Sequence, residues 1–191
     1  MNEEILSPVV SIGLPVFNGG KSVRKTIEAV LSQTFRNFEL IISDNASTDS
    51  TYKICKEFEK KDKRVRCVQQ KNNMGPWWNF NFVLKEAKSD YFLWTAGDDY
   101  MSENYLESNL EIIRNNKKCI GSVGKTNYFG TTVEELKPVL NDSLTGKVNK
   151  KVRRWLSSFY INSFEGTYNE KIRMALKWTG AGLYMYGIFK T

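Results

Sequence analysis

The sequence contains no histidine, and this absence narrows the chemistry open to the chain. Histidine triads, histidine metal sites and histidine general bases are all excluded within these 191 residues. Cysteine is also scarce, and Cys55, Cys67 and Cys119 show neither zinc nor redox-motif spacing. We therefore expect reduced thiols in the core of a cytoplasmic protein.

Long hydrophobic runs are missing as well. No apolar stretch reaches the roughly 18 residues that indicate a transmembrane helix. The N-terminal sequence MNEEILSPVV has two acids where a signal peptide is basic. With 41% hydrophobic and 26% charged residues, the composition is typical of one soluble globular domain.

Positive charge is plentiful, and the net charge of +7 arises from residues 111–191. A basic surface suits nucleic acid, an anionic membrane or a phosphorylated substrate, and a merely solvated surface explains it equally well. The stretch KVNKKVRRW (147–155) sets basic residues beside a tryptophan, which favours peripheral contact with the inner face of a membrane or a lipid diphosphate acceptor. No RNP or helix-turn-helix signature is present, so we expect no nucleic acid partner.

Apolar runs alternate with helical periodicity over the first 130 residues. The runs predict strands at 9–14, 38–43, 65–70, 91–96 and 119–129. Between them, apolar residues recur at helical spacing, as in Val23, Ile27 and Val30. This alternation predicts an α/β fold, with a mostly parallel sheet and helices on both faces.

The loops that follow four of these strands are expected to meet at one edge of the sheet, where such folds bind ligands. Their sequences are PVFNGG, DNAS, KNNMGP and GDD. In the first loop, a helix N-terminus near Lys21 would face a bound phosphate, although a plain strand-to-helix turn explains the residues nearly as well. In the second, Asp44 suits either the imide N–H of uracil or the cap of the next helix.

Two adjacent carboxylates, Asp98 and Asp99, are the sharpest feature of this edge. Like charges this close disfavour one another unless a cation lies beside them. Carboxylate oxygens suit Mg²⁺ or Mn²⁺, which commonly bridges to substrate phosphates. The alternative is an acidic turn in which Asp99 or Ser102 caps the following helix.

Five motifs, in order, resemble family 2 glycosyltransferases of the GT-A (Rossmann-like) fold. They are Pro15-Val16-Phe17-Asn18, Leu31-Ser32-Gln33-Thr34, Asp44-Asn45-Ala46-Ser47-Thr48-Asp49, Asn73-Met74-Gly75 and Gly97-Asp98-Asp99. The resemblance covers about residues 8–130, and GLYMYGIFKT at the end is similar to a further strand of bacterial members. We expect a nucleotide-sugar binding core over 1–130 and the start of an acceptor-side region over 131–191.

The resemblance implies an inverting transfer of sugar from a nucleoside-diphosphate sugar, with UDP favoured. The acceptor would be a glycan or a lipid-linked glycan in surface polysaccharide synthesis. The metal, Mg²⁺ or Mn²⁺, would be bound by Asp99 and Asp98. The residues implied in donor-nucleotide binding are Pro15, Val16, Phe17, Asn18, Asp44, Asn73, Gly75, Asn79, Gly97 and Asp98.

The sequence departs from the family pattern at several positions. Phe17 replaces a tyrosine, Asn45 and Ala46 replace an aspartate and a glycine, and Ala96 occupies a carboxylate position. The family's catalytic base lies downstream of the segment similar to GLYMYGIFKT, so we expect it beyond Thr191. Glu165 and Glu170 lie upstream of that segment, and we therefore expect a piece of a longer enzyme that transfers sugar poorly.

Two tryptophans, Trp77 and Trp78, lie just beyond the third strand, where they could stack on a sugar; for Trp78 we favour packing in the helix core.

Two other functions remain open. A sugar nucleotidyltransferase shares the α/β plan, although PVFNGGKS only loosely matches its glycine-rich loop. A non-catalytic basic binding module is the other.

Overall fold

The computed structural model describes residues 7–116, 119, 121–124 and 187–190. The basic stretch 147–155, Glu165, Glu170 and nearly all of the expected acceptor-side region lie outside the described residues. In the described part, no helix has both the length and the apolar character needed to cross a membrane.

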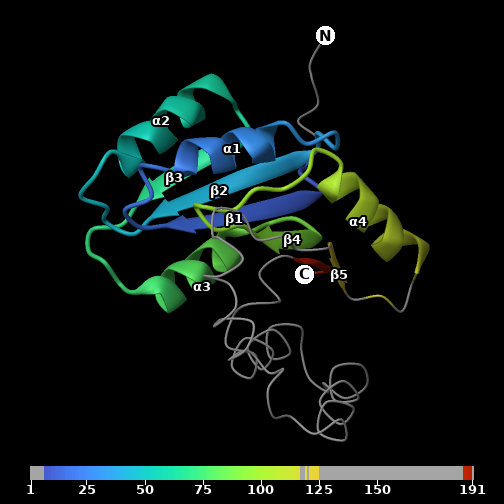
Figure 1. Cartoon of the computed structure of the whole chain (residues 1–191). Helices are drawn as coiled ribbons and strands as arrows, with labels where there is room; N and C mark the ends of the chain where they lie inside the picture. Colours follow the sequence, from blue (N-terminus) through green and yellow to red (C-terminus); the bar gives the residue numbers. More distant parts are fainter. Residues whose placement is uncertain (1–6, 117–118, 120, 125–186, 191) are drawn as a thin grey trace, which may run out of the picture. The chain divides into compact units, whose positions relative to one another are not determined.

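A six-stranded sheet forms the centre of the described structure (Figure 1). Its strands are β1 (Val10–Val16), β2 (Phe38–Asp44), β3 (Val65–Gln69), β4 (Tyr91–Trp94), β5 (Gly121–Val123) and β6 (Gly187–Lys190). They lie in the order β3-β2-β1-β4-β6-β5. The first four are parallel, whereas β6 runs antiparallel to both β4 and β5.

Four helices cover the two faces of this sheet. They are α1 (Val23–Leu31), α2 (Thr51–Lys61), α3 (Pro76–Glu86) and α4 (Tyr105–Asn115). Helices α1, α2 and α4 lie on one face and α3 lies on the other (Figure 1). The predicted α/β fold, with a mostly parallel sheet between two layers of helices, is confirmed.

A cluster of buried apolar residues lies between the sheet and helices α1, α2 and α4. Ile12, Leu14 and Leu40 from the strands are fully buried there with Ile27 and Leu110 from the helices. Burying apolar side chains of this size contributes about 1.5–3 kcal/mol each. The cluster therefore fixes the strand ends from which the loops of the site begin.

The cysteines are free thiols in the described structure, as the spacing indicated. Cys55 and Cys67 are buried, and Cys119 is half-buried. The hydrogen bond with Cys67, together with burial, raises the pKa of the Cys55 thiol, so Cys55 is held in the neutral form.

The pairing of the strands places the loops after β1, β2 and β3 side by side at one edge of the sheet. Val16 pairs with Asp44, and Asp44 pairs with Gln69, so β1, β2 and β3 end side by side. Strand β4 lies on the other side of β1 and ends opposite Gly13. The sheet order thus reverses between β1 and β4, which is where open α/β sheets bind ligands.

Candidate functional site

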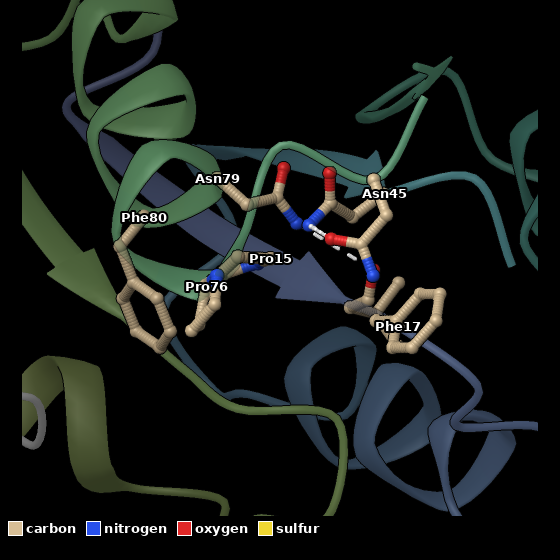
Figure 2. Close-up of a pocket in the computed structure, with 8 residues that line it drawn as sticks. Pro15, Phe17, Asn45, Pro76, Asn79 and Phe80 are labelled. Atoms are coloured by element: carbon tan, nitrogen blue, oxygen red, sulfur yellow. Dashed lines mark hydrogen bonds between the residues drawn. The ribbon is translucent and has the colours of Figure 1, made fainter. Parts of the chain in front are cut away.

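A pocket of about 210 Å³ opens at the carboxyl ends of the central strands. Its lining comes from the end of β1, the loops after β2 and β3, and the first turns of α3: Pro15, Val16, Phe17, Asn45, Asn73, Pro76, Asn79 and Phe80. Figure 2 shows Phe80 and Phe17 on opposite sides of this pocket, with Pro15 and Pro76 between them. Two aromatic rings and two prolines form flat apolar walls, which suit a planar ring system.

The loop after β1 is joined to the loop after β2 by hydrogen bonds. The Asn18 N–H donates to Ser47 Oγ at 2.8 Å, and Asn18 Oδ1 accepts from the Thr48 N–H at 2.9 Å. The Gly20 N–H donates to Asp49 Oδ2 at 2.9 Å. Asn18 has a φ of 51°, a left-handed conformation that asparagine adopts more readily than most residues. These contacts hold the two loops in one arrangement beside Phe17.

Asp49 anchors the start of α2. Its carboxylate accepts hydrogen bonds from the Thr51 hydroxyl and the Thr51 N–H. These bonds from Thr51, together with the bond from Gly20, hold the pKa of Asp49 below its ordinary value. The turn between the two loops is therefore held by an ionised carboxylate at neutral pH.

Asp44 lies at the end of β2 with its side chain fully buried. Its carboxylate accepts weak hydrogen bonds from the Ser47 N–H, at 3.3 and 3.4 Å, and from Gln69 Nε2 at 3.3 Å. These bonds hold the turn at 44–47. Ser50 is the N-cap of α2, so the structure does not show Asp44 capping that helix, which was the alternative to base recognition. Asp44 does not line the pocket, although its neighbour Asn45 does.

Asn79 fixes α3 to the ends of two strands. Its Nδ2 donates to the Ser43 carbonyl at 2.9 Å and to the Val16 carbonyl at 3.5 Å, while its Oδ1 accepts from the Ser43 hydroxyl at 2.5 Å. The residue is only 2% exposed, so these bonds satisfy groups that water cannot reach. Asn79 thereby sets the distance between the wall formed by α3 and the floor formed by β1.

The carboxylates after β4 differ in their surroundings. Asp98 is exposed and makes no side-chain hydrogen bond within the described residues. Asp99 Oδ2 accepts from the Ala96 N–H at 2.7 Å, and its backbone carbonyl accepts from the Thr26 hydroxyl at 2.9 Å. A Cβ built on Gly97 would lie 3.0 Å from Val16 Cγ2, so this loop passes close to the end of β1.

The structure brings together some of the predicted residues and separates others. Pro15, Val16, Phe17, Asn73 and Asn79 line the pocket, whereas Asn18, Asp44, Gly75, Gly97, Asp98 and Asp99 do not. Three further lining residues, Asn45, Pro76 and Phe80, are not among the predicted ones. Asn45 enters the prediction only as a departure from the family pattern. Pro76 and Phe80 lie on the first turns of the helix that follows the Asn73-Met74-Gly75 motif, and this position could have indicated them.

The two tryptophans of α3 are both on the surface. Trp77 is 52% exposed, and Trp78 is 36% exposed and stacks on Phe82 with ring centroids 5.3 Å apart. Packing of Trp78 in the helix core, which the sequence favoured, is therefore wrong. Because α3 buries mainly Asn79 and Val83, its first turns leave large rings outside.

A cation bound by protein side chains alone has no site in the described ranges, which hold no group of three or more potential ligands. Mg²⁺ is commonly held by one or two carboxylates together with substrate phosphates. The exposed carboxylate of Asp98, next to Asp99 at a strand end, fits that second arrangement. The donor set is therefore compatible with a cation that arrives with a phosphate ligand.

Residues 11–174 match the family described as Glycosyl transferase family 2. Because the match covers most of the sequence, the chain belongs to this family. The α/β fold, with its mostly parallel sheet, is that of GT-A glycosyltransferases.

Two curated bacterial relatives match the first part of the chain. Glycosyltransferase GlyG of Streptococcus pneumoniae is 35% identical over 103 residues, which are 54% of this chain and 34% of GlyG. The putative teichuronic acid biosynthesis glycosyltransferase TuaG of Bacillus subtilis is 33% identical over 106 residues, which are 56% of this chain and 42% of TuaG. The chain thus spans well under half the length of either relative.

Two solved structures share the fold. TarS 1–349 of S. aureus, in complex with UDP-GlcNAc, superposes with a TM-score of 0.56 and 24% identity, over 67% of this chain and 38% of the TarS 1–349 chain. The mannosyltransferase PcManGT of Pyrobaculum calidifontis, in complex with GDP-Man and Mn²⁺, gives a TM-score of 0.57 at 18% identity, over 62% of this chain and 36% of PcManGT.

Proposed function

We propose that the chain is the donor-binding part of an inverting glycosyltransferase that uses a nucleoside-diphosphate sugar, with UDP favoured. The observation that carries this proposal is the flat-walled pocket at the strand ends of a family 2 chain. The complex of TarS with UDP-GlcNAc supports UDP, and the complex of PcManGT with GDP-Man makes a guanine donor the alternative to exclude.

The nucleobase and ribose would be held at the end of β1. Phe17 is 47% exposed and lines the pocket, so its ring is available for stacking on a base. Pro15, Val16, Asn18, Asn73, Gly75 and Asn79 would form the surrounding surface. In this proposal Asp44 pairs with the base imide, and Ser47, whose N–H now contacts the carboxylate, moves aside while Asn45 stays in place.

The diphosphate and its cation would lie beside the loop after β4. Asp98 and Asp99 would hold Mg²⁺ or Mn²⁺, and Gly97 would allow the close approach of the ribose and diphosphate. When bound, the ion supplies Lewis-acid stabilisation to a departing diphosphate. In this proposal Asp98 makes the main contact with the ion, since its carboxylate is exposed.

The acceptor in this proposal is a glycan or a lipid-linked glycan of a surface polysaccharide. The name of TuaG, which refers to teichuronic acid biosynthesis, supports this class of product. A cytoplasmic location with peripheral contact to an anionic membrane, through the basic stretch 147–155, completes the proposal.

Calorimetric titration of the 191-residue chain with UDP-, GDP- and dTDP-sugars, in Mn²⁺ and in EDTA, tests the donor and the metal together. We expect the UDP-sugar to bind most tightly and Mn²⁺ to strengthen its binding. Asp98→Asn should weaken binding in Mn²⁺ about tenfold, or about 1.4 kcal/mol, and should leave binding in EDTA nearly unchanged.

Asp90→Asn is the matched control for this experiment. Asp90 is equally exposed but precedes β4, at the end of that strand remote from the site, so its loss should alter neither affinity. Equal affinity of wild-type protein for the UDP-sugar in EDTA and in excess Mn²⁺ would refute the metal role. The absence of binding to any of the three donors would refute the proposed function.

A further inference from the structure

Asn45 connects three segments that meet at the pocket. Its backbone N–H donates to the Val16 carbonyl at 2.9 Å, at the end of β1. Its side-chain Nδ2 donates to Asn73 Oδ1 at 2.9 Å and to the Gly75 carbonyl at 3.2 Å. Its Oδ1 accepts from the Met74 N–H at 3.0 Å. The residue is 2% exposed, so these bonds form away from water.

The backbone partners determine which way the carboxamide faces. The Met74 N–H can only donate, so it must meet the oxygen of Asn45, and the Gly75 carbonyl can only accept, so it must meet the nitrogen. Asn73 Oδ1 is fixed in the same way, because it also accepts from the Gly75 N–H at 2.9 Å. The arrangement therefore needs a side chain that both donates and accepts at this position.

Neither aspartate nor alanine meets that requirement. A carboxylate could accept from Met74, but it would place a negative oxygen against the Gly75 carbonyl and Asn73 Oδ1. It would also place a second charge next to Asp44, which is fully buried. Alanine would leave all three partners without the bonds that they now make. The amide at position 45 is thus matched to the amide at position 73.

The segment that Asn45 holds leads directly into the pocket wall. Gly75 has a φ of 83° and is followed by Pro76, the first residue of α3 and a lining residue of the pocket. Because the segment is short and Pro76 has a fixed φ, a displacement at Met74 or Gly75 moves the start of α3. The width of the pocket between Pro76 and Phe17 therefore depends on the bonds of Asn45.

We infer that Asn45 is a positioning residue for donor binding: through Asn73 and the 74–75 backbone, its carboxamide sets the wall of the donor pocket. This inference rests on the proposed function, since it names the ligand of the pocket as a nucleoside-diphosphate sugar. The residue acts on the donor through the segment that it holds.

Asn45→Asp tests the inference because the new carboxyl can be switched by pH. At about pH 8 it should be ionised and unable to donate, and UDP in the presence of Mn²⁺ should bind about tenfold to a hundredfold more weakly than to wild type. Burial and Asp44 should raise the pKa of the new carboxyl. At about pH 5 its protonated form can donate again, so the difference from wild type should shrink several-fold.

Two further variants keep the test decisive. Asn73→Ala removes the side chain that accepts from the Asn45 amide. Asn73 is an exposed loop residue, so the variant should fold, and it should bind UDP more weakly without any recovery at low pH. Asn72→Asp is the matched control: its side chain is exposed and makes no hydrogen bond within the described residues, so the same change should alter UDP affinity little. Amide hydrogen exchange of the peptide 70–80 provides a readout without ligand, and Asn45→Asp should accelerate exchange there.

The outcomes separate the inference from the proposed function. Unchanged UDP affinity and unchanged exchange in Asn45→Asp would overturn the inference while leaving the function intact. Weaker binding that does not recover at low pH, with Asn72→Asp equally affected, would also overturn it. A wild-type chain that binds no nucleotide would overturn the proposed function, and the exchange comparison would then decide whether Asn45 positions the segment.

Discussion

At the scale of single residues, the turns around the pocket depend on backbone conformations that few side chains tolerate. Asn18 and Ala46 both have positive φ, at 51° and 62°. Asparagine adopts this region with little difficulty, whereas alanine is opposed by contact between its Cβ and the following carbonyl. Ala46, where the family pattern has glycine, is therefore a strained position within the loop after β2.

Replacing Ala46 with glycine should stabilise the protein. Relief of the left-handed strain should stabilise the folded state by about 1–2 kcal/mol. The greater freedom of glycine in the unfolded chain should offset about 0.4–1 kcal/mol of this gain. We expect a net gain of up to about 1.6 kcal/mol, measured as an increase in the urea midpoint without a change in slope.

The same substitution at Ala87 should have the opposite effect on the stability of the protein. Ala87 is also half-buried, but it has a φ of −68° in the extended region, where alanine is unstrained. Ala87→Gly should therefore lower the free energy of unfolding by about 0.4–1 kcal/mol, because glycine gives the unfolded chain more freedom. If both variants are destabilised equally, the conformation of Ala46 does not strain the turn.

At the scale of elements, α3 lies unusually close to β1. A Cβ built on Gly13 would come within 2.6 Å of Val83 Cγ2 and 2.7 Å of the Phe92 ring. Gly13→Ala should therefore destabilise the protein by about 1–3 kcal/mol, because the fully buried Val83 has no room to move away. Urea denaturation of the purified variant measures this cost.

A double-mutant cycle with Val83→Ala shows whether this contact is responsible. Val83→Ala alone leaves a cavity, but in the Gly13→Ala background it also removes the overlap, so the two costs should sum to more than the cost of the double variant. Additive costs would mean that Gly13→Ala acts elsewhere, for example through Phe92.

The elements were largely predictable, and the pairing across loops was not. The strands at 38–43 and 91–96 were found within a few residues of β2 and β4, since buried parallel strands are continuous apolar runs. The match between Asn45 and Asn73 depends on a register that brings residues 28 positions apart into contact, and no local pattern encodes it. The exposure of Trp78 was missed because helical spacing identifies a face but not what covers it.

At the scale of the whole molecule, a strand from the far end of the sequence lies inside the sheet. Ile188 of β6 pairs with Leu93 of β4 and is fully buried in the same cluster as Leu110 of α4. Ile188→Ala should cost about 2–5 kcal/mol, as for other large core aliphatic side chains. The free energy of unfolding from urea titration is the measurement.

Lys190→Ala is the comparison within the same strand. Lys190 is half-buried and pairs with Tyr91, so its loss should cost a small fraction of the Ile188 effect. Similar small costs at both positions would mean that β6 contributes little to the stability of the sheet.

The place of β6 in the sheet also affects how the protein is made. During synthesis the four parallel strands are complete once residue 94 has left the ribosome, but in the described sheet β5 pairs with β6 alone. Until residues 187–190 emerge, the side of β4 that pairs with β6 in the described sheet lacks this partner, and an unpaired strand edge can recruit a strand from another chain. The described six-stranded sheet can therefore be completed only after nearly the whole of this sequence has been synthesised.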